Sequence, residues 1–359
     1  MKGIITAGGR GTRMRPLTFS SNKHLIPIAN KPLIFYALES LAEAGIKEIG
    51  INYNPGQFEE LKVSLGNGKK WGVKLTYILQ PQPLGLADVI KVSREFLGKD
   101  KFVMYLGDNI FFGGIKPLVD YFKKSKATAL LALVHHPENR RLGVPYFNRQ
   151  GKLIKLVEKP PKPPHDWAIS GLYFASEEIF KCFSGKKAIK PSARGEYEIT
   201  SPFQWLIKEG YEVETREFKG VWLDPGKFED WLETNRFILD QNTKNGIKSK
   251  LGKGVKIEGR VQIDSGCRIE KSLLRGPVTI GKKVIIRDSF IGPYSSIYDH
   301  CQIIGARIEN SILLKSVKIF SPSKIIDSSL IGQETEIQGN HHQNGALELF
   351  VGNQCEIKL

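Results

Sequence analysis

Short apolar runs alternate with amphipathic stretches along the first hundred residues of the chain. The runs are too brief for buried helices and predict strands at residues 3–6, 47–53, 73–79 and 102–106. The stretches between them repeat apolar positions at helical spacing and predict helices at residues 32–44, 58–65 and 85–97. Strands that alternate with helices indicate an α/β domain with a doubly wound, mostly parallel sheet. Ligands of such sheets bind in the loops beyond the carboxyl ends of the strands.

The pattern changes in the middle of the chain, where strands follow one another without long helices between them. Residues 144–148 and 152–158 predict a hairpin through a turn at 149–151. A further helix is expected at 228–239, and the polar stretch 240–253 is typical of a linker.

An imperfect six-residue repeat occupies the last third of the chain. Apolar side chains recur six positions apart in two series, Val255, Val261, Cys267 and Leu273, and Ile257, Ile263 and Ile269. The repeat predicts a parallel β-helix with about three hexads per coil, and it resembles the left-handed β-helix of hexapeptide proteins. We therefore expect two domains, residues 1–241 and residues 242–359.

Length and charge narrow the class of protein. A chain of 359 residues is too long for one compact core. Its net charge of +16 favours anionic partners, but the lysines are scattered and no nucleic-acid-binding motif is present. Small phosphorylated ligands therefore explain the charge better than nucleic acid does.

No apolar run approaches the roughly 20 residues that span a bilayer, and no leader precedes the first strand, so we expect a cytoplasmic protein that does not contact a membrane. The four cysteines show no zinc pattern and are expected to be free thiols.

A glycine-rich turn with clustered cations follows the first predicted strand. Gly8, Gly9 and Gly11 allow the backbone to approach a ligand and direct successive N–H groups at an anion. The dinucleotide-binding pattern fails because Met14 stands where its third glycine belongs, and no Walker pattern is present. Arginine forks match phosphate oxygens, and the cations of this segment are Arg10, Arg13, Arg15 and Lys23. The turn therefore predicts a polyphosphate site.

The same segment carries a long, spaced motif. Residues 8–18 are G-G-R-G-T-R-M-R-P-L-T, residues 23–27 are K-H-L-I-P, and Lys31 and Pro32 follow. With these residues the chain resembles the sugar-phosphate nucleotidyltransferases over essentially its whole length, in particular the long-form glucose-1-phosphate thymidylyltransferases with a C-terminal left-handed β-helix. The resemblance implies a Rossmann-like catalytic domain that transfers a nucleotidyl group from dTTP or UTP to glucose 1-phosphate. Mg²⁺ would be the cofactor and pyrophosphate the second product.

The resemblance also implies roles for individual residues. The nucleotide would be bound by Gly8, Gly9, Gly11, Thr12, Arg13, Gln80 and Gly85. The Mg²⁺ ligands would be Asp108 and Asp224. The sugar phosphate would be bound by Gly143, Glu158, Lys159, Arg194 and Trp222. The catalytic residues would be Arg13, Lys23, Asp108 and Lys159.

Elementary chemistry supports parts of these assignments. Asp108 ends a predicted strand, and a carboxylate in such a loop suits Mg²⁺, which prefers hard oxygen ligands. The Gln80 amide can pair with both a donor and an acceptor on a base edge. Because alternate side chains on a strand point in opposite directions, Lys159 must lie at a strand end or a kink to join Glu158.

Two other functions stay open on the sequence. A regulatory subunit would bind a nucleotide sugar without turnover, although the implied catalytic residues are all present. A bifunctional enzyme would use the β-helix for acyl transfer, with a histidine such as His300, His341 or His342. Packing and assembly into a homo-oligomer explain the β-helix better, because no long loop interrupts the repeat to form an acyl-donor site. Thymine and uracil are not separated either, since one methyl group gives only about 1–3 kcal/mol of discrimination.

Overall fold

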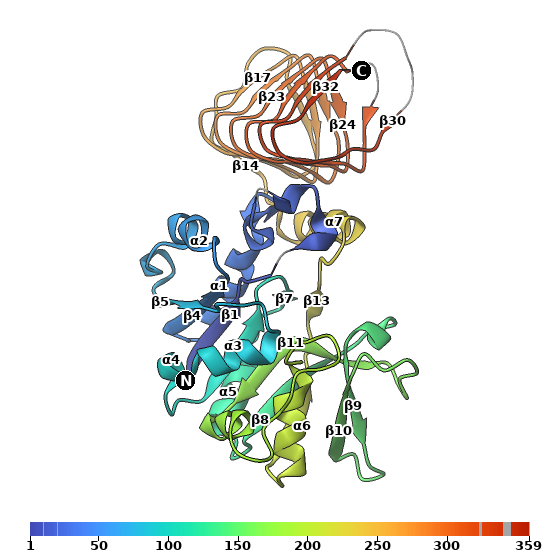
Figure 1. Cartoon of the computed structure of the whole chain (residues 1–359). Coiled ribbons are helices and arrows are strands. Elements are labelled where there is room, and N and C mark those ends of the chain that lie inside the picture. The colour runs from blue at the N-terminus through green and yellow to red at the C-terminus, as the bar shows by residue number, and fades with distance from the viewer. Residues whose placement is uncertain (10, 20, 323–324, 340–345, 359) are drawn as a thin grey trace. The chain divides into compact units, whose positions relative to one another are not determined.

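The computed structural model describes residues 1–9, 11–19, 21–322, 325–339 and 346–358, and Figure 1 shows the course of the chain. The chain forms two compact units. The first comprises Met1–Gly9 and Ile34–Asp224, and the second comprises Arg10–Leu33 and Pro225–Leu359. The segment that follows the glycine turn is thus grouped with the C-terminal part of the chain, and the expected boundary after residue 241 stays a prediction.

The first unit is built around a seven-stranded sheet in the order β12-β8-β11-β6-β1-β4-β5. The four strands predicted from apolar runs are confirmed, as Lys2–Thr6 (β1), Glu48–Tyr53 (β4), Lys74–Leu79 (β5) and Phe102–Leu106 (β6). The others are Ala129–His135 (β8), Trp167–Ala175 (β11) and Val213–Glu217 (β12). β11 is antiparallel to β6 and β8, and the other four pairings are parallel. The sheet is therefore mixed and mostly parallel, as in Rossmann-like folds.

Helices connect many of these strands, and two of the three predicted in this part are confirmed. The α-helices are Leu33–Glu43 (α1), Phe58–Leu65 (α2), Leu86–Val92 (α3), Arg94–Leu97 (α4), Lys116–Lys124 (α5) and Thr200–Lys208 (α6). Short 3-10 helices lie at Lys69–Trp71 (η4), Asn139–Arg141 (η5) and Glu177–Phe183 (η6). The prediction of one helix over 85–97 is wrong, because the helix is interrupted at Ser93. The Ser93 hydroxyl donates to the Val89 carbonyl at 2.7 Å, and a bond of this kind bends helices.

Two antiparallel pairs lie beside the main sheet. Gly143–Phe147 (β9) and Leu153–Glu158 (β10) form the hairpin that the sequence predicts. Ile110–Phe112 (β7) pairs with Val221–Leu223 (β13), which lies far away in sequence. The first pair ends at Gly143 and Glu158, and the second contains Trp222 and is followed by Asp224, all of which have predicted roles in the site.

The core of the first unit joins the sheet to α3, α6 and η6. Buried side chains from these elements pack in one cluster that includes Ile4, Phe102, Met104, Ile90 and Phe203. Dense packing of this kind gives the strand ends a rigid support, which a binding site needs.

The second unit begins with the segment after the glycine turn. It contains the 3-10 helices Thr12–Met14 (η1), Leu17–Phe19 (η2) and Lys23–Leu25 (η3), followed by a small hairpin of Pro27–Ile28 (β2) and Lys31–Pro32 (β3). Helix Phe228–Asn242 (α7) belongs to the same unit and contacts β2.

The rest of the second unit consists of three stacks of short parallel strands, visible as regular coils in Figure 1. The first stack contains Gly246–Ile247 (β14), Val261–Ile263 (β16), Val278–Ile280 (β19), Ser295–Ile297 (β22), Ile312–Leu313 (β25), Leu330–Ile331 (β28) and Phe350–Val351 (β31). The second contains Lys256–Glu258 (β15), Leu273–Arg275 (β18), Phe290–Ile291 (β21), Arg307–Ile308 (β24), Ile325–Ile326 (β27) and Ala346–Leu347 (β30). The third contains Arg268–Glu270 (β17), Ile285–Arg287 (β20), Gln302–Ile304 (β23), Lys318–Phe320 (β26), Glu336–Gln338 (β29) and Glu356–Lys358 (β32). These stacked parallel strands are consistent with the predicted left-handed β-helix.

The six-residue repeat sets the length of a coil. Val261 pairs with Val278, and Val278 pairs with Ser295, so one coil takes about three hexads, as predicted. The linker predicted at 240–253 is wrong, because α7 continues to Asn242 and β14 already pairs with β16. The pattern did not indicate β14 because its residues are exposed, and ladder hydrogen bonds do not require apolar side chains.

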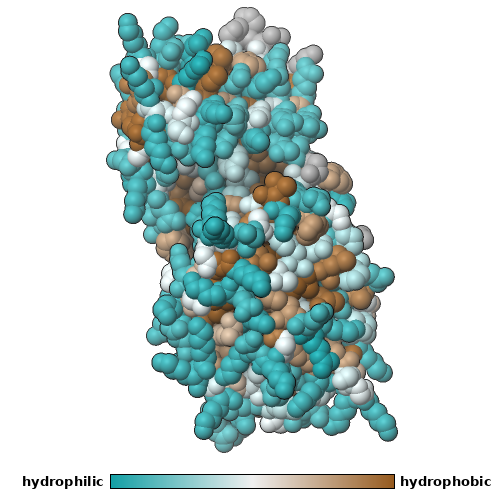
Figure 2. Space-filling model, turned by 90° about the vertical axis from the view of Figure 1, so that its left-hand side faces the viewer, coloured by the Kyte–Doolittle hydropathy of each residue, from teal (hydrophilic) through white to brown (hydrophobic). Residues whose placement is uncertain are grey.

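Several remaining expectations concern single residues. The four cysteines are free thiols, and His300 lies at an exposed corner of the β-helix with φ 64°. Arg10, His341 and His342 lie outside the described residues. In the described parts of the chain, no helix is long and apolar enough to cross a membrane. The face in Figure 2 is mainly hydrophilic, with smaller hydrophobic patches between the polar side chains.

Candidate active site

Two strand ends bring the predicted metal ligands together. Asp108 and Asn109 follow β6, and Asp224 follows β13. β7 pairs with β13 so that Ile110 lies opposite Leu223, and Asn109 and Asp224, the residues just outside this pair, are therefore neighbours. The register of one short ladder thus brings together carboxylates that lie far apart in sequence.

The Asn109 amide connects the two carboxylates. Its Nδ2 donates to Asp108 Oδ1 at 3.2 Å and to Asp224 Oδ1 at 3.0 Å, and its Oδ1 accepts from Trp222 Nε1 at 3.0 Å. Because an indole N–H only donates, the amide oxygen must face Trp222 and the nitrogen must face the carboxylates. Asn109 is 2% exposed, whereas Asp108 is half-buried and Asp224 is exposed. A buried amide of fixed orientation therefore holds two accessible acids close together.

A bulge in β11 makes room for this amide. The register of β11 against β8 shifts between Ile169 and Tyr173, and Gly171 within the bulge has φ 86°. A Cβ atom at Gly171 would overlap Asn109 Oδ1. The bulge and its glycine therefore permit the close approach of backbone and amide.

Asp108 and Asp224 fit a divalent cation that keeps most of its other ligands. Mg²⁺ is usually held by one or two carboxylates together with water and substrate phosphates, not by a cage of protein ligands. Among the residues that the structure describes, no group of three or more histidine, cysteine, aspartate or glutamate side chains is arranged to hold a metal. The donor set at Asp108 and Asp224 thus suits Mg²⁺ better than it suits zinc, which takes a closed tetrahedral set.

The end of β10 carries the predicted residues for the sugar phosphate. β10 ends at Glu158, which pairs with Gly143 on β9, and Lys159 follows with φ 48°. This kink brings Lys159 Nζ to 3.6 Å from Glu158 Oε1, which confirms that the lysine lies at a strand end on the same side as the glutamate. Thr200 Oγ1 donates to Glu158 Oε2 at 3.3 Å, and a Cβ atom at Gly143 would lie 2.8 Å from Thr200 Cγ2. Glycine is therefore required beside this pair.

Glu158 lies in a partly desolvated position. Burial raises the pKa of the Glu158 carboxyl, against the opposing effect of the adjacent Lys159.

Arg194 Nη2 lies 2.7 Å from Glu198 Oε1, so its guanidinium is already paired in this structure. A sugar phosphate that binds Arg194 would therefore compete with Glu198.

Strand β11, which contains Tyr173, lies beside both groups of acids. Burial raises the pKa of Tyr173, and the charges of Glu158 and Asp224 raise it further. A Cβ atom at Gly143, the partner of Glu158, would lie 3.1 Å from Ile169 Cδ1, and Gly171 on the same strand packs against Asn109, so the two groups of acids belong to one region of the first unit.

The predicted base-reading residue Gln80 belongs to a buried amide network. Its Nε2 donates to Asp88 Oδ2 at 2.9 Å and to Gly85 O at 3.1 Å, and Asn54 Nδ2 donates to its Oε1 at 3.3 Å. The Gly85 carbonyl only accepts, so the Gln80 amide nitrogen must face it. Asn54 Oδ1 in turn accepts from the Gly9 N–H at 2.7 Å. The network therefore connects the glycine turn after β1 to the loop before α3.

Two predicted glycines pack against protein atoms. A Cβ atom at Gly8 would lie 2.5 Å from Asn54 Oδ1. Gly85 has φ 99°, and a Cβ atom there would lie 2.6 Å from Tyr197 O. The close approach that glycine permits at position 85 is thus to the backbone of Tyr197, and contact of Gly85 with a base stays a prediction.

The remaining phosphate-binding residues belong to the second unit. Gly11 has φ 55° and precedes η1, which contains Thr12 and Arg13, and Lys23 begins η3. A Cβ atom at Gly11 would lie 3.3 Å from Lys23 Cβ, so these two positions of the loop are neighbours. Thr12 and Arg13 are exposed, and Lys23 is half-buried. That these cations meet the same substrate as Asp108 stays a prediction.

Sequence analysis missed the polar residues that orient the predicted ones. These residues are buried, with exposed fractions between 2% and 9%, and comprise Asn54, Asp88, Asn109 and Thr200. Asn109 alone carried a signal, because it directly follows Asp108 at the end of a strand. The others lie far in sequence from most of the groups they hold, and no local pattern indicates them.

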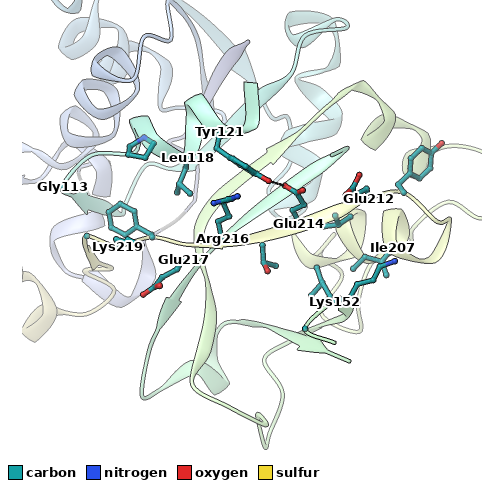
Figure 3. A pocket seen from close by; sticks show the side chains of 18 of the residues that line it. Gly113, Leu118, Tyr121, Lys152, Ile207, Glu212, Glu214, Arg216, Glu217 and Lys219 are labelled. Atoms are coloured by element: carbon teal, nitrogen blue, oxygen red, sulfur yellow. Dashed lines mark hydrogen bonds between the residues drawn. The ribbon is translucent and has the colours of Figure 1, made fainter. Parts of the chain in front are cut away.

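A cavity of about 1310 Å³ opens along the edge strand β12, as Figure 3 shows. Inside it Tyr121 Oη donates to Glu214 Oε2 at 2.7 Å, and the Arg216 guanidinium lies 3.5 Å from the centre of the Tyr121 ring. None of the predicted site residues lines this cavity. The cavity and the candidate site are therefore different regions of the first unit.

A mixed α/β sheet with paired acids at its strand ends, a Glu–Lys pair and a glycine turn defines an enzyme of phosphorylated substrates. The nucleotidyl transferase family model matches residues 2–241, and the chain belongs to this family. Enzymes of this family generally depend on a divalent metal.

Relatives match the chain over its whole length. It is 37% identical to the glucose-1-phosphate thymidylyltransferase of Streptomyces griseus over 359 residues, which cover 100% of this chain and 99% of that protein. It is 36% identical over 364 residues to the low-salt glycan biosynthesis nucleotidyltransferase Agl11 of Haloferax volcanii, with 100% of both chains covered. A solved Bacillus anthracis protein, described as a glucose-1-phosphate thymidylyltransferase and bound to sucrose, has 36% identity and a TM-score of 0.62. The match covers 67% of this chain and 96% of that one.

The raised pKa of Glu158 predicts a pH-dependent effect on stability. An acid with a higher pKa in the folded chain than in the unfolded chain loses stability as the pH rises through that interval. Glu158→Gln removes the ionisable group and keeps an acceptor for Thr200, so we expect it to raise the unfolding temperature at pH 7. The gain should shrink toward zero below the ordinary glutamate pKa of about 4.3, where both forms are neutral.

Thermal unfolding across this pH range measures the effect. Glu196→Gln, a change at an exposed glutamate, is the matched control and should leave the curve unchanged. A Glu158→Gln variant that is less stable than the wild type at pH 7 and equal to it in acid would show that the fold favours the ionised carboxylate.

Proposed function

We propose that this enzyme transfers a nucleotidyl group from dTTP or UTP to glucose 1-phosphate, giving the nucleoside diphosphate glucose and pyrophosphate. The observation that carries the proposal is the Asn109 amide, which holds Asp108 and Asp224 together beside the strand β11 that also packs against the Glu158–Lys159 pair at Gly143. The full-length Streptomyces griseus relative bears the name of this reaction, which supports the choice of substrates.

The reaction displaces pyrophosphate at the α-phosphorus of the nucleotide. A phosphate oxygen of glucose 1-phosphate attacks and forms a new P–O bond, while the bond from the α-phosphorus to the oxygen that bridges the β-phosphate breaks. The electron pair of that bond leaves with pyrophosphate. The attacking oxygen is already anionic, so no protein base has to remove a proton. The barrier comes from bringing two anions together, and fixed positive charge and positioning lower it.

Each cation of the site binds a different phosphate group of the substrates. Lys159 binds the attacking sugar phosphate, and Arg194 joins it after releasing Glu198. Lys23 binds the phosphoryl group in transfer, and Arg13 binds the departing pyrophosphate. The N–H groups of the turn at Gly8, Gly9, Gly11 and Thr12 bind the triphosphate oxygens.

Asp108 and Asp224 would hold Mg²⁺, which supplies positive charge at the phosphates when it is bound. Asn109 keeps both carboxylates oriented toward the same point, because its two amide protons are directed at one oxygen of each. Both carboxylates would then hold the ion together.

Glu158 selects the sugar. Thr200 occupies one of its oxygens, and the other oxygen lies beside Lys159, so a sugar hydroxyl and the sugar phosphate bind to adjacent groups. Gly143 offers its backbone to the sugar, since Thr200 fills the place of a side chain there, and Trp222 supports the metal side through its bond to Asn109.

Gln80 selects the base. Its amide nitrogen is committed to Gly85 and Asp88, and its oxygen, which accepts from Asn54 at 3.3 Å, keeps a second lone pair for the nucleotide. Uracil and thymine present a donor at N3, whereas cytosine presents an acceptor there. A fixed acceptor therefore favours dTTP and UTP over CTP, but does not separate thymine from uracil.

We also infer a cytoplasmic homo-oligomer with small-molecule substrates. Four free thiols suit a reducing compartment, and the regular exposed coils of the β-helix suit assembly. A matrix of nucleoside triphosphates against sugar 1-phosphates, with pyrophosphate release as the readout, tests the substrates directly. Addition of an acyl-CoA to the same reactions tests the acyltransferase alternative.

Removal of one metal ligand should abolish most turnover. We expect Asp108→Asn to lower kcat by about 10²–10³-fold, the scale for loss of one preorganised charge contact, with the unfolding temperature little changed. Pyrophosphate release with dTTP, glucose 1-phosphate and Mg²⁺ measures it. Asp120→Asn, at an exposed position on α5, is the control and should retain wild-type kcat. Undiminished turnover in Asp108→Asn would refute the assignment.

Asp88 should control base selectivity through Gln80. Asp88→Leu removes one of the two acceptors that hold the Gln80 amide nitrogen and leaves only the Gly85 carbonyl, so the amide is less firmly fixed and can turn to donate to cytosine. A hydrogen bond to a charged group contributes about 1.5–3 kcal/mol, and we expect the ratio of kcat/KM for UTP over CTP to fall about 10-fold or more. Asp88→Asn keeps an acceptor and should retain most of the ratio. An equal loss with both nucleotides would mean that Asp88 serves only the fold.

A further inference from the structure

The segment that carries Arg13 and Lys23 is compact with the β-helix and α7, not with the sheet. The β-helix therefore belongs to the same compact unit as part of the predicted phosphate-binding site. The contacts that hold the segment identify which residues determine its conformation.

Asn235 on α7 joins three parts of the second unit. Its Oδ1 accepts from the Ala29 N–H at 2.9 Å and from Ser296 Oγ at 2.7 Å, and its Nδ2 donates to Tyr294 O at 3.0 Å. The Tyr294 carbonyl only accepts, so the orientation of the amide is fixed. Asn235 is 1% exposed and Ser296 is 0% exposed, so water does not replace these bonds.

The turn that Asn235 holds has an unfavourable backbone. Ala29 and Asn30 connect β2 to β3 with φ 49° and 60°, a conformation that alanine adopts rarely. Asn30 Nδ2 donates to Ile297 O at 2.8 Å, on the β-helix strand that also contains Ser296. Backbone strain of this kind persists only where the surroundings fix it. The β-helix supplies those surroundings.

A second attachment lies at the start of the segment. Asn353 Nδ2 donates to Ser21 Oγ at 2.9 Å, and a Cβ atom at Gly352 would lie 3.2 Å from Pro16 Cβ. Both β-helix residues belong to its last coil. Lys23 therefore lies between two attachments to the β-helix, one before it and one after it.

We propose that the β-helix and α7 form the platform that sets the conformation of the phosphate-binding segment, and that Asn235 is its central positioning residue. The proposal rests on the proposed function in one respect, since it assumes that Lys23 and Arg13 act on the nucleotide. Asn235 does not touch substrate and acts through the turn at Ala29. Loss of its bonds should displace Lys23, and a displacement of about 1 Å can lower a rate by about 10²-fold.

Asn235→Ala in the full-length protein tests the proposal. We expect kcat/KM for the nucleotide to fall about 10–100-fold, with KM for glucose 1-phosphate within about twofold of wild type. Backbone amides of residues 22–33 should exchange hydrogen faster than in the wild type. Arg236→Ala is the matched control, because Arg236 lies next on the same helix and donates a hydrogen bond to Asn310 of the β-helix. It should change neither readout.

Asn30→Gly provides a second variant in case Asn235→Ala does not fold. Glycine keeps the positive φ of the turn and removes the side-chain bonds to Ile297 and Thr279, so we expect the same changes in smaller measure. The proposal is overturned if both variants match Arg236→Ala, or if kcat alone falls in proportion to the loss of folded protein. A wild-type enzyme without turnover would refute the proposed function instead, and the exchange rates would still decide whether Asn235 fixes the segment.

Discussion

The candidate site depends on one hydrogen-bonded group, the Asn109 amide between Asp108 and Asp224. Two carboxylates repel each other, and without a shared donor they would turn apart. The indole of Trp222 fixes which end of the amide faces them, and the glycine bulge in β11 leaves space for it. Because the amide is buried and fully bonded, its position is set by the fold and not by the ligand. The site is in this sense organised before a metal or substrate arrives, which is what catalysis by positioning and fixed charge requires.

The same principle recurs in the rest of the molecule. Asn54 links the glycine turn to Gln80, and Asn235 links the turn at Ala29 to the β-helix. In each case an asparagine amide uses its acceptor and its donors on different elements, so that a buried side chain fixes two loops at once. Loops that bind anions have to present backbone N–H groups and cations outward, and they therefore have few apolar contacts of their own. Buried amides provide the order that the missing apolar contacts would otherwise give.

Much of the fold was predictable because it depends on local patterns. Apolar runs identified β1, β4, β5 and β6, and six-residue spacing identified the coils of the β-helix. Two predictions were wrong for specific reasons. The helix predicted over 85–97 is interrupted at Ser93, whose hydroxyl bonds the Val89 carbonyl. The linker predicted over 240–253 contains the strand β14, whose residues are exposed and therefore show no apolar pattern. Residues of the site could be predicted from the sequence only where they belong to a recognisable motif. Asn109 can bond both acids because the register of β7 against β13 brings Asp224 beside it. Asn235 can hold the turn because it bonds both Ala29 and Ser296. Such pairings span most of the chain, and no spacing in the sequence encodes them.

Metal affinity tests the central claim most directly, because it reports on the carboxylate pair without depending on the chemical step. Titration of the full-length protein with Mn²⁺ in the presence of dTTP, followed by electron paramagnetic resonance, gives this affinity for the wild type and for Asn109→Leu. Leucine fills a similar volume but cannot donate to either acid. Partners that orient metal ligands typically contribute a factor of about 10–100 in affinity, and the account predicts a loss of that size with Asp108 and Asp224 unchanged. Equal affinity in a correctly folded Asn109→Leu variant would contradict it.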